Sequence, residues 1–192
     1  MTMPRPPAYI ALLHFPVFDR TGRVVATAIT NLDIHDLARS ARTFGLRAYY
    51  LVTPLERQRE LATRIVSYWG DETGPRAEAL KTVRIASALE EVVAAVAAES
   101  GRPLVVGTAA GRRPAAAGKL TEGEALLAQA REQQRPLLLL FGTGWGLSDE
   151  VLEQCDRVLP PIRGEDDYNH LSVRSAAAII LDRLFGERHG VE

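Results

Sequence analysis

Short apolar runs rich in valine, isoleucine, leucine and tyrosine alternate along this sequence with segments whose apolar residues recur at helical spacing. This alternation is typical of βα units built around a mostly parallel sheet that carries helices on both faces. The expected strands cover residues 9–14, 24–30, 48–52, 82–86, 104–108, 137–141 and 157–159. The sequence therefore predicts an α/β fold.

Length and composition indicate one globular unit. At 192 residues, with 46% hydrophobic and 24% charged residues, the chain is too apolar for disorder and too charged for a membrane span. We therefore expect a single domain over 1–192 and no membrane partner. Residues 1–8 carry three prolines and one arginine without the apolar stretch of a signal peptide, and we expect them to form a loose arm.

Charge and cysteine content restrict the possible chemistry. A net charge of −1 gives no overall attraction for nucleic acid, so any RNA site must be a local basic patch. The single cysteine, Cys155, excludes an internal disulfide and suits a reducing cytoplasm. The four histidines show no metal-ligand spacing, and no bound metal is expected.

Three helix starts carry the same signal, a threonine or serine followed three residues later by glutamate. The pattern occurs at Thr53, Ser87 and Thr121. In a capping box, that hydroxyl accepts a hydrogen bond from the first turn of the helix while the glutamate bonds back. We therefore expect a helix to start at each position, the first of them running toward Tyr68.

The most informative stretch is residues 137–150. An apolar strand leads into a loop with glycine at alternate positions, Gly142, Gly144 and Gly146, and then into a helix opened by Ser148. Glycines allow a backbone to approach a ligand closely, so the pattern favours a ligand-binding βα turn. A purely structural turn is the plain alternative. A dinucleotide-binding turn of an NAD-dependent oxidoreductase is another, supported by Glu165 about 20 residues on but disfavoured by acids in the helix's first turn.

Two further segments follow. After the expected short strand at 157–159 come Pro160 and Pro161, which cannot continue a central ladder, so the chain must leave the sheet there. Residues 167–175 then lead into an alanine-rich helix over 176–185. The small residues in the first turn of that helix would let another part of the backbone pack very close.

These three segments, in this order, resemble the signature motifs of the SPOUT superfamily of S-adenosylmethionine-dependent RNA methyltransferases. The resemblance implies a C-terminal trefoil knot, S-adenosylmethionine as cofactor, an RNA substrate such as tRNA or rRNA, and a homodimer that completes each site. It also implies a set of cofactor-binding residues, most of which would act through their backbone. They are Gly142, Thr143, Gly144, Leu159, Pro161, Ile162, Leu171, Ser172 and Val173.

Residues 27–45 are similar to the first SPOUT motif, in which an asparagine follows a strand and an arginine lies on the next helix. The resemblance implies catalytic roles for Asn31 and Arg39, although the spacing between them is about two residues longer than in the ribose-methylating branch. The residues alone allow a plainer interpretation. Arg39 and Arg42 would share a solvated helix face, and Asn31 would be a helix cap.

RNA binding at this net charge requires arginines gathered beside the methyl donor. The candidate substrate-binding residues are Arg42, Arg112, Arg113, Arg163 and Arg174. If a nitrogen nucleophile needs a base, three acids in one loop, Glu165, Asp166 and Asp167, are placed for that role. A binding module that keeps the knot without catalysing methyl transfer is the alternative from a different functional class.

Overall fold

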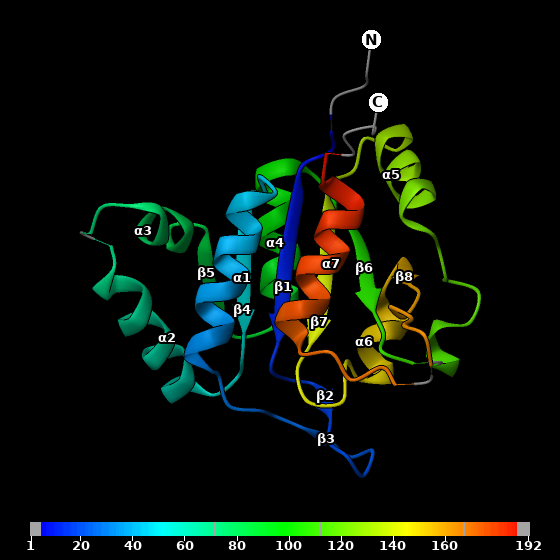
Figure 1. The fold of residues 1–192 in the computed structure, drawn as a ribbon, viewed down its shortest axis with the longest axis horizontal. Helices are drawn as coiled ribbons and strands as arrows, with labels where there is room; N and C mark the ends of the chain where they lie inside the picture. Colours follow the sequence, from blue (N-terminus) through cyan, green and yellow to red (C-terminus); the bar gives the residue numbers. More distant parts are fainter. Residues whose placement is uncertain (1–4, 71, 112, 167, 188–192) are drawn as a thin grey trace.

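The computed structural model describes residues 5–70, 72–111, 113–166 and 168–187. Its centre is a six-stranded parallel sheet with the strand order β5-β4-β1-β7-β6-β8 (Figure 1). The strands are β1 (Ala8–Leu13), β4 (Ala48–Val52), β5 (Val83–Ala86), β6 (Leu104–Thr108), β7 (Leu137–Gly142) and β8 (Arg157–Leu159). A separate antiparallel pair consists of β2 (Val17–Phe18) and β3 (Val24–Val25).

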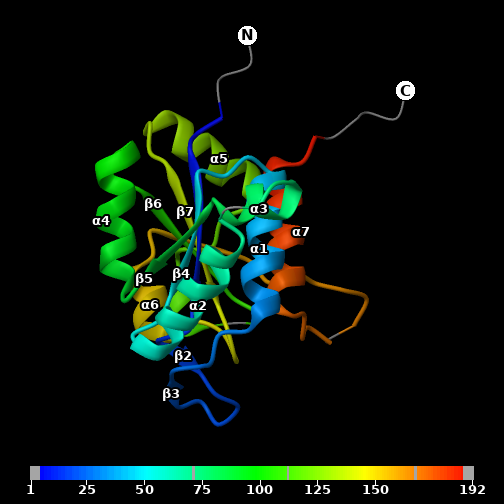
Figure 2. The same cartoon turned by 90° about the vertical axis from the view of Figure 1, so that its left-hand side faces the viewer.

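Helices cover both faces of the sheet (Figure 2). The helical elements are α1 (Asn31–Thr43), α2 (Glu56–Tyr68), α3 (Pro75–Leu80), α4 (Leu89–Ser100), the 3-10 turn η1 (Pro114–Ala116), α5 (Gly123–Glu132), α6 (Asp149–Gln154) and α7 (Val173–Phe185). Alternate strand residues point to opposite faces, so Ile10 and Leu12 join the core under α1, α5 and α7, whereas Tyr9 and Leu13 join the core under α4 and α6. The α/β prediction is confirmed.

The expected strand over 24–30 is wrong in most of its length. Only Val24 and Val25 are extended in a pair, and their partner is β2 rather than the main sheet. The chain then turns back, because the Thr27 amide donates to the His14 carbonyl at 2.8 Å. Val24, Ala26 and Ala28 are exposed, so the apolar and β-branched composition of this segment does not correspond to a place in the main sheet.

The three expected capping boxes are wrong, although the helices exist. The residues that precede α2, α4 and α5 are Leu55, Ala88 and Glu122, and none of them makes a side-chain cap. Side-chain caps occur at Thr30, Ser148 and Ser172, of which only Ser148 was expected. Thr30 takes the place that the sequence offered to Asn31, which lies inside the first turn of α1.

The described part of the expected N-terminal arm, from Arg5 onward, contacts the rest of the protein. Residues 1–4 lie outside the described part of the chain, but the Pro7 carbonyl accepts a 2.8 Å hydrogen bond from the Leu137 amide. The Arg5 guanidinium lies 3.8 Å from the centre of the Phe185 ring. Residues from Arg5 onward are thus fixed to the sheet and to α7. β1 enters the sheet between β4 and β7 at this point.

The parallel strands end together on one edge of the sheet, beside β2 and β3 (Figure 1). The chain builds outward from β1 through β4 to β5, and only later places β7 on the other side of β1. Open α/β sheets bind ligands outside the carboxyl ends of the strands where the order reverses in this way. A ligand-binding site is therefore expected just beyond Leu13 and Gly142, at the carboxyl ends of β1 and β7.

Candidate functional site

A cavity of about 730 Å³ lies at this edge. Its walls come from the ends of β6 and β7, from the start of α1, and from the chain that leads into α7. Cavities of this size are typical of sites for small molecules and cofactors. Both apolar side chains, such as Ile162, and polar ones, such as Asp33, face it.

The loop after β7 is held by its own tight packing. A Cβ added to Gly142 would lie 2.5 Å from the Leu147 amide nitrogen, and Gly144 has a φ of +59° with its added Cβ 2.8 Å from the Phe18 carbonyl oxygen. Backbone bonds of 2.9 Å join Phe18 to Trp145 and to Gly146. We expected these glycines to allow close approach to a ligand, but Gly142 and Gly144 are required first by contacts within the protein.

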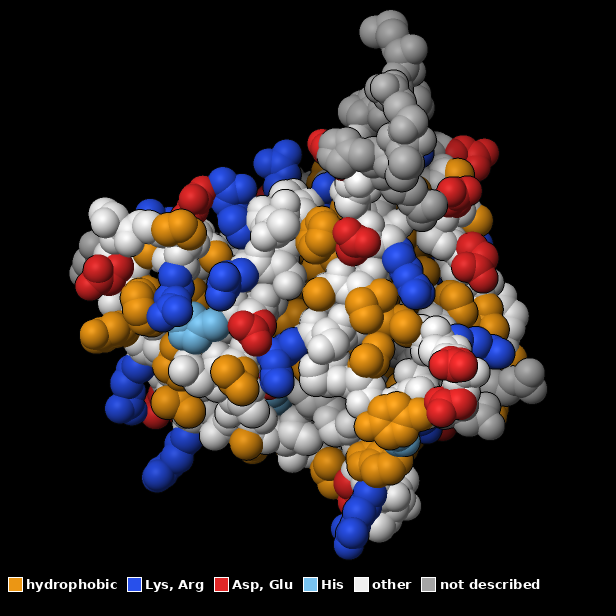
Figure 3. All heavy atoms as spheres, in the orientation of Figure 1, with side chains coloured by type: hydrophobic (Ala, Val, Ile, Leu, Met, Phe, Trp, Pro, Cys, Tyr) orange, Lys and Arg blue, Asp and Glu red, His pale blue; other side chains and the backbone are white. Residues whose placement is uncertain are grey.

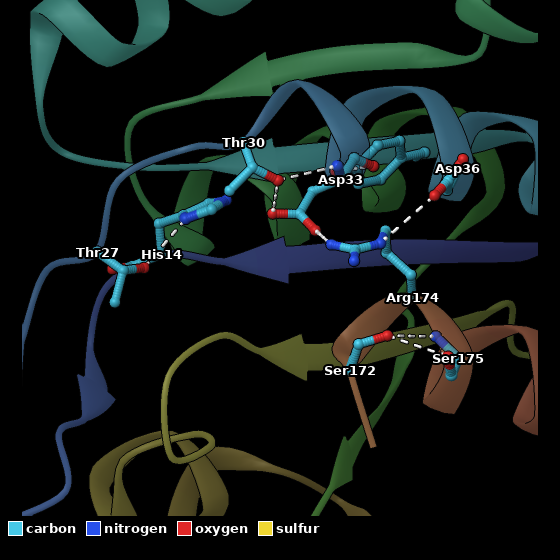
Figure 4. A network of polar contacts seen from close by, with 9 residues as sticks. His14, Thr27, Thr30, Asp33, Asp36, Ser172, Arg174 and Ser175 are labelled. Carbon is cyan, nitrogen blue, oxygen red and sulfur yellow. Dashed lines mark hydrogen bonds and ion pairs between the residues drawn. The ribbon is translucent and has the colours of Figure 1, made fainter. Parts of the chain in front are cut away.

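Thr143 anchors the same loop through its side chain. Its hydroxyl donates to the Leu13 carbonyl at 3.2 Å and lies 2.5 Å from the Thr27 hydroxyl, which is 3.1 Å from Nδ1 of His14 (Figure 4). His14 is fully buried, and its Nε2 has no hydrogen-bond partner among the described residues. Burial lowers the pKa of His14, against the opposing effect of the Asp33 charge, so the ring is neutral near pH 7.

A buried ion pair forms another wall of the cavity. Asp33 is 4% exposed, and its Oδ1 accepts a 2.8 Å bond from the Arg174 guanidinium of α7. Its Oδ2 accepts a 2.6 Å bond from the Thr30 hydroxyl, and Asp36 lies 3.4 Å from Nε of Arg174 (Figure 4). Sequence reasoning did not single out Asp33. Thr30 is a typical helix N-cap residue, but no local pattern links Asp33 to Arg174.

Most of the expected cofactor-binding residues converge on the cavity. Seven line it: Gly142, Thr143, Gly144, Ile162, Leu171, Ser172 and Val173. The other two, Leu159 and Pro161, do not line it. Leu159 is instead buried in the core under α7. Pro160 lines the cavity instead. The chain leaves the sheet directly after Leu159, so the first proline turns toward the cavity.

The expected catalytic residues do not line this cavity. Arg39 is exposed on α1, in a shallow groove that also includes Ser172 and Arg174. Asn31 is exposed at the start of the same helix and borders a different hollow. Within the described part of the chain, neither side chain makes a hydrogen bond or an ion pair. Their assignment to catalysis in the same subunit is therefore not supported by the geometry.

The basic candidates that the structure describes do not all gather at the cavity. Arg113 lines the cavity, donates to the Trp145 carbonyl at 3.0 Å, and lies 4.7 Å from the centre of the Phe18 ring. Arg174 also lines the cavity, but its charge is balanced by acids. Arg42 pairs with Glu78 of α3, away from the cavity, so the expectation that it joins the other arginines is wrong. Arg163 is exposed outside the lining. Arg112 lies outside the described residues.

The expected acids do not reach the cavity either. Glu165 and Asp166 are exposed and lie outside its lining, and Asp167 is outside the described residues. Among the residues that the structure describes, the acid that faces the cavity is Asp33. Within the part of the chain that the structure describes, no group of three or more histidine, cysteine or acidic side chains is placed to hold a metal ion.

An aromatic cluster stands where the chain approaches α7. The His170 ring lies 5.6 Å from that of Trp145 and 5.5 Å from that of Tyr168, with both pairs edge to face. Trp145 and His170 line the cavity, and Trp145 and Tyr168 are 53% and 71% exposed. These rings offer a stacking surface beside the cavity, and no sequence motif points to them.

Comparison with known sequences gives a clear match. Residues 7–186 match the family described as "SAM-dependent RNA methyltransferase". The chain is 46% identical over 185 residues to a protein of Oleidesulfovibrio alaskensis called tRNA (guanine-N(1)-)-methyltransferase, covering 93% of this chain but 42% of that protein. It is 41% identical over 183 residues to an uncharacterized protein of Aquifex aeolicus, covering 92% of this chain and 87% of the relative. The chain thus spans about two fifths of the length of the named relative.

Solved structures with the same fold are more distant in sequence. A probable methylase family protein from Haemophilus influenzae Rd KW20 aligns with a TM-score of 0.63 and 20% identity, covering 92% of this chain and 64% of that one. The SpoU methyltransferase AviRb from Streptomyces viridochromogenes, in complex with AdoMet, aligns with a TM-score of 0.58 and 18% identity, covering 95% and 59%. At these identities the likeness concerns the fold.

Proposed function

Because the chain belongs to the family of S-adenosylmethionine-dependent RNA methyltransferases, of the SPOUT type, we propose that its cavity holds this methyl donor and that the protein methylates RNA. One observation carries the proposal. Seven residues from three separate sequence motifs, which the SPOUT resemblance links to the cofactor, line a single cavity at the carboxyl ends of the strands.

The chemistry of the walls fits S-adenosylmethionine. Ile162, Leu171 and Val173 give an apolar surface suited to an adenine ring, while the hydroxyl of Thr30 and the Asp33 carboxylate give a polar and acidic one. The cofactor carries a positively charged sulfonium, and a buried acid in the wall offsets a cation. When bound, the cofactor supplies an electrophilic methyl group on sulfur, so the protein's main task is orientation.

Asp33 is placed to orient groups in the cavity and not to remove a proton unaided. Each of its oxygens already accepts a short hydrogen bond, one from Arg174 and one from Thr30, and these bonds fix the orientation of the carboxylate. The pair holds the start of α7 against α1 beside Ser172 and Val173. Arg113, which also lines the cavity, is the basic side chain available to an RNA phosphate.

The RNA species and the methylated atom are a separate proposal. The named relatives are tRNA (guanine-N(1)-)-methyltransferases, and the match covers 42% of each. The printed activity belongs to those longer proteins, so guanine N1 is a hypothesis for this chain. We propose tRNA as the first substrate to test, with rRNA as the second and with ribose as well as base positions examined.

We also propose a homodimer, because Arg39 lies outside the cavity of its own subunit. It is exposed on α1, in the groove that α1 forms with α7. An arginine in that position can serve a cavity only if a second copy of the chain packs against this groove. Asn31, exposed at the start of the same helix, would then lie near the same interface.

Three further proposals concern the domain organisation, the knot and the cellular location. The chain would act as one domain, with the segment after Tyr168 threaded through the preceding βα units to form a trefoil knot. It would work in the cytoplasm, where its RNA substrate is found. In the part of the chain that the structure describes, no helix is both long enough and apolar enough to cross a bilayer.

Calorimetry and a transfer assay test the function together. We expect S-adenosylmethionine to bind with micromolar affinity and NAD not to bind. With a radiolabelled methyl donor, we expect counts to enter tRNA or rRNA, and nucleoside analysis of the product then identifies the atom. Binding of NAD without binding of S-adenosylmethionine would overturn the proposal. Donor and RNA binding without any transfer would favour the non-catalytic binding module.

A further inference from the structure

A second hollow, of about 540 Å³, lies beside α2 and α3, away from the cavity that we assign to the methyl donor. We call it the Trp69 groove. Its lining includes His35, Arg39, Arg64, Tyr68, Trp69 and Arg76. The methyl-transfer chemistry outlined above uses none of its aromatic residues, and their arrangement calls for a separate explanation.

The aromatic rings of the groove pack on the protein core on one side and are exposed to solvent on the other. Trp69 packs against the core under α1, and its ring meets those of Tyr68 and His35 edge to face, with centres 5.5 and 5.9 Å away. Tyr68 is 73% exposed at the end of α2. A large aromatic side chain held in this way offers its face to a flat partner at little entropic cost.

The charge of the groove is positive. The Arg76 guanidinium lies 4.9 Å from the centre of the Trp69 ring, and Arg39 and Arg64 belong to the same lining. Within the described residues, none of these three arginines is in an ion pair, whereas several arginines elsewhere on the surface are. The acid in the lining, Asp36, already faces Arg174. The groove thus combines unpaired arginines with exposed rings.

The groove is continuous with the cavity along the surface of α1. A shallow hollow between them shares Ser172 and Arg174 with the cavity, and Asp36 and Arg39 with the Trp69 groove. Figure 3 shows basic, hydrophobic and histidine side chains gathered on this face, over α1, α2 and α3. This hollow is the groove of α1 and α7 against which we propose that a second copy packs, so the Trp69 groove would lie beside that interface.

We propose that the Trp69 groove binds an unstacked nucleotide of the RNA substrate, with its base against Tyr68 and its phosphates against the arginines. Proteins recognise unpaired RNA through aromatic faces combined with arginine, since every base has a face to stack and every phosphate a charge to meet. This inference rests on the proposed function, because it takes the partner to be RNA. It adds a binding site about which the cofactor motifs say nothing.

Anisotropy of labelled tRNA and of a single-stranded 12-nucleotide RNA tests the site in the full chain. Tyr68→Ala should weaken the binding of both RNAs by at least about five-fold, the lower range for loss of one stacked base. Arg64→Glu should weaken it as well, and should reduce the slope of log affinity against log salt by about one. Both variants should keep the parental melting temperature, because both side chains are exposed.

Arg131→Glu is the matched control, since Arg131 is an exposed arginine on α5, remote from the groove. It should leave RNA affinity within two-fold. Parental RNA affinity and salt slope in both groove variants would overturn the inference, as would a parental protein that binds no RNA. S-adenosylmethionine binding is measured separately by calorimetry. Its absence would overturn the proposed function while the effect of Tyr68→Ala on RNA binding remains readable.

Fluorescence identifies the class of partner. The chain has two tryptophans, so Trp145→Phe leaves Trp69 as the only reporter. RNA should quench its emission, and poly-glutamate at equal charge should not, because a polypeptide acid has no ring to stack. Equal quenching by poly-glutamate with equal dependence on Tyr68 would show a general acidic-protein site and would contradict the assignment to RNA.

Discussion

Arg174 and Asp33 lie 141 positions apart in the sequence and meet at 2.8 Å in the wall of the cavity. Removing one partner of such a pair leaves a charge with little solvent around it, which costs more than the pair contributes. Arg174→Met should therefore lower the free energy of unfolding by about 2 kcal/mol. The double variant Arg174→Met with Asp33→Leu should recover part of this loss. Urea denaturation gives both values, and simple additivity of the two single changes would contradict the coupling.

Thr143→Val replaces a hydroxyl that bonds to Leu13 and Thr27 by a methyl group of the same shape. We expect a loss of stability of about 1 kcal/mol and weaker binding of S-adenosylmethionine, because the loop after β7 loses its side-chain anchor. Thr63→Val, on exposed α2, removes a local hydrogen bond far from the cavity and serves as the control. Equal cofactor affinity in the two variants would argue against the anchoring role.

Gly142→Ala should disturb the same loop by a different route. The added Cβ would meet backbone atoms of Gly146 and Leu147 at 2.8 and 2.5 Å, and backbone cannot move aside as a flexible side chain can. Stability and cofactor affinity should therefore fall together. Gly164→Ala is the control, since nothing lies within 4 Å of its added Cβ. Thermal melting and calorimetry compare the two. If Gly142→Ala keeps the melting temperature and the cofactor affinity of the parental protein, then the loop adopts another conformation.

Burial of His14 makes stability depend on pH. Its pKa is lowered from 6.5 in the folded protein, so below pH 6.5 the unfolded chain binds a proton that the folded chain does not. Stability should accordingly be constant above that pH and fall on acidification toward the folded pKa. In His14→Asn this fall should be shallower, with the remainder assigned to His35, whose pKa is also lowered by burial and nearby arginines. Urea midpoints between pH 5 and 8 measure the slope. Parallel profiles for the two proteins would exclude His14 as the source.

Cys155 should be inert in the folded protein. It is 3% exposed, and burial raises the pKa of its thiol to about 12, so the reactive thiolate is scarce at pH 8. A colorimetric thiol reagent should therefore react with the native protein only at the rate of unfolding, and at once after addition of urea. Fast reaction of the native protein would show that the packing of α6 against β6 opens readily.

The sheet was largely predictable because its signal is local. Five of the central strands are fully or mostly apolar runs, such as those at β1 and β7, and their positions agree with expectation to within a residue or two. The prediction of a strand over 24–30 was wrong because Val24 and Val25 pair with β2 alone and the rest of the segment does not pair in the main sheet. The prediction of the cap of α1 was wrong for a related reason. Whether Thr30 or Asn31 caps the helix depends on the conformation of the preceding loop, which tertiary contacts determine.

The site was predictable where a motif fixes the backbone, and not where side chains from distant segments meet. The glycine loop and the turn before α7 reached the cavity as expected. Asp33 escaped notice because its importance comes from Arg174, which no local pattern links to it. Arg42 was misplaced because sequence position on α1 does not reveal Glu78 of α3 as its partner. The Trp69 groove likewise depends on three elements packing together.

The central pairing of the sheet joins β1 to β7, with Ala8 opposite Leu137 in the register. During synthesis on a ribosome, β1 emerges before β7 and cannot gain this neighbour until more than a hundred further residues have followed. Pairings of such long range make folding slow, because a large loop must close before the contact forms. Until then one side of an apolar strand has no hydrogen-bonding partner and is open to aggregation. The same event brings the Gly142 loop to the end of β1, so the cavity and the middle of the sheet form at the same late moment.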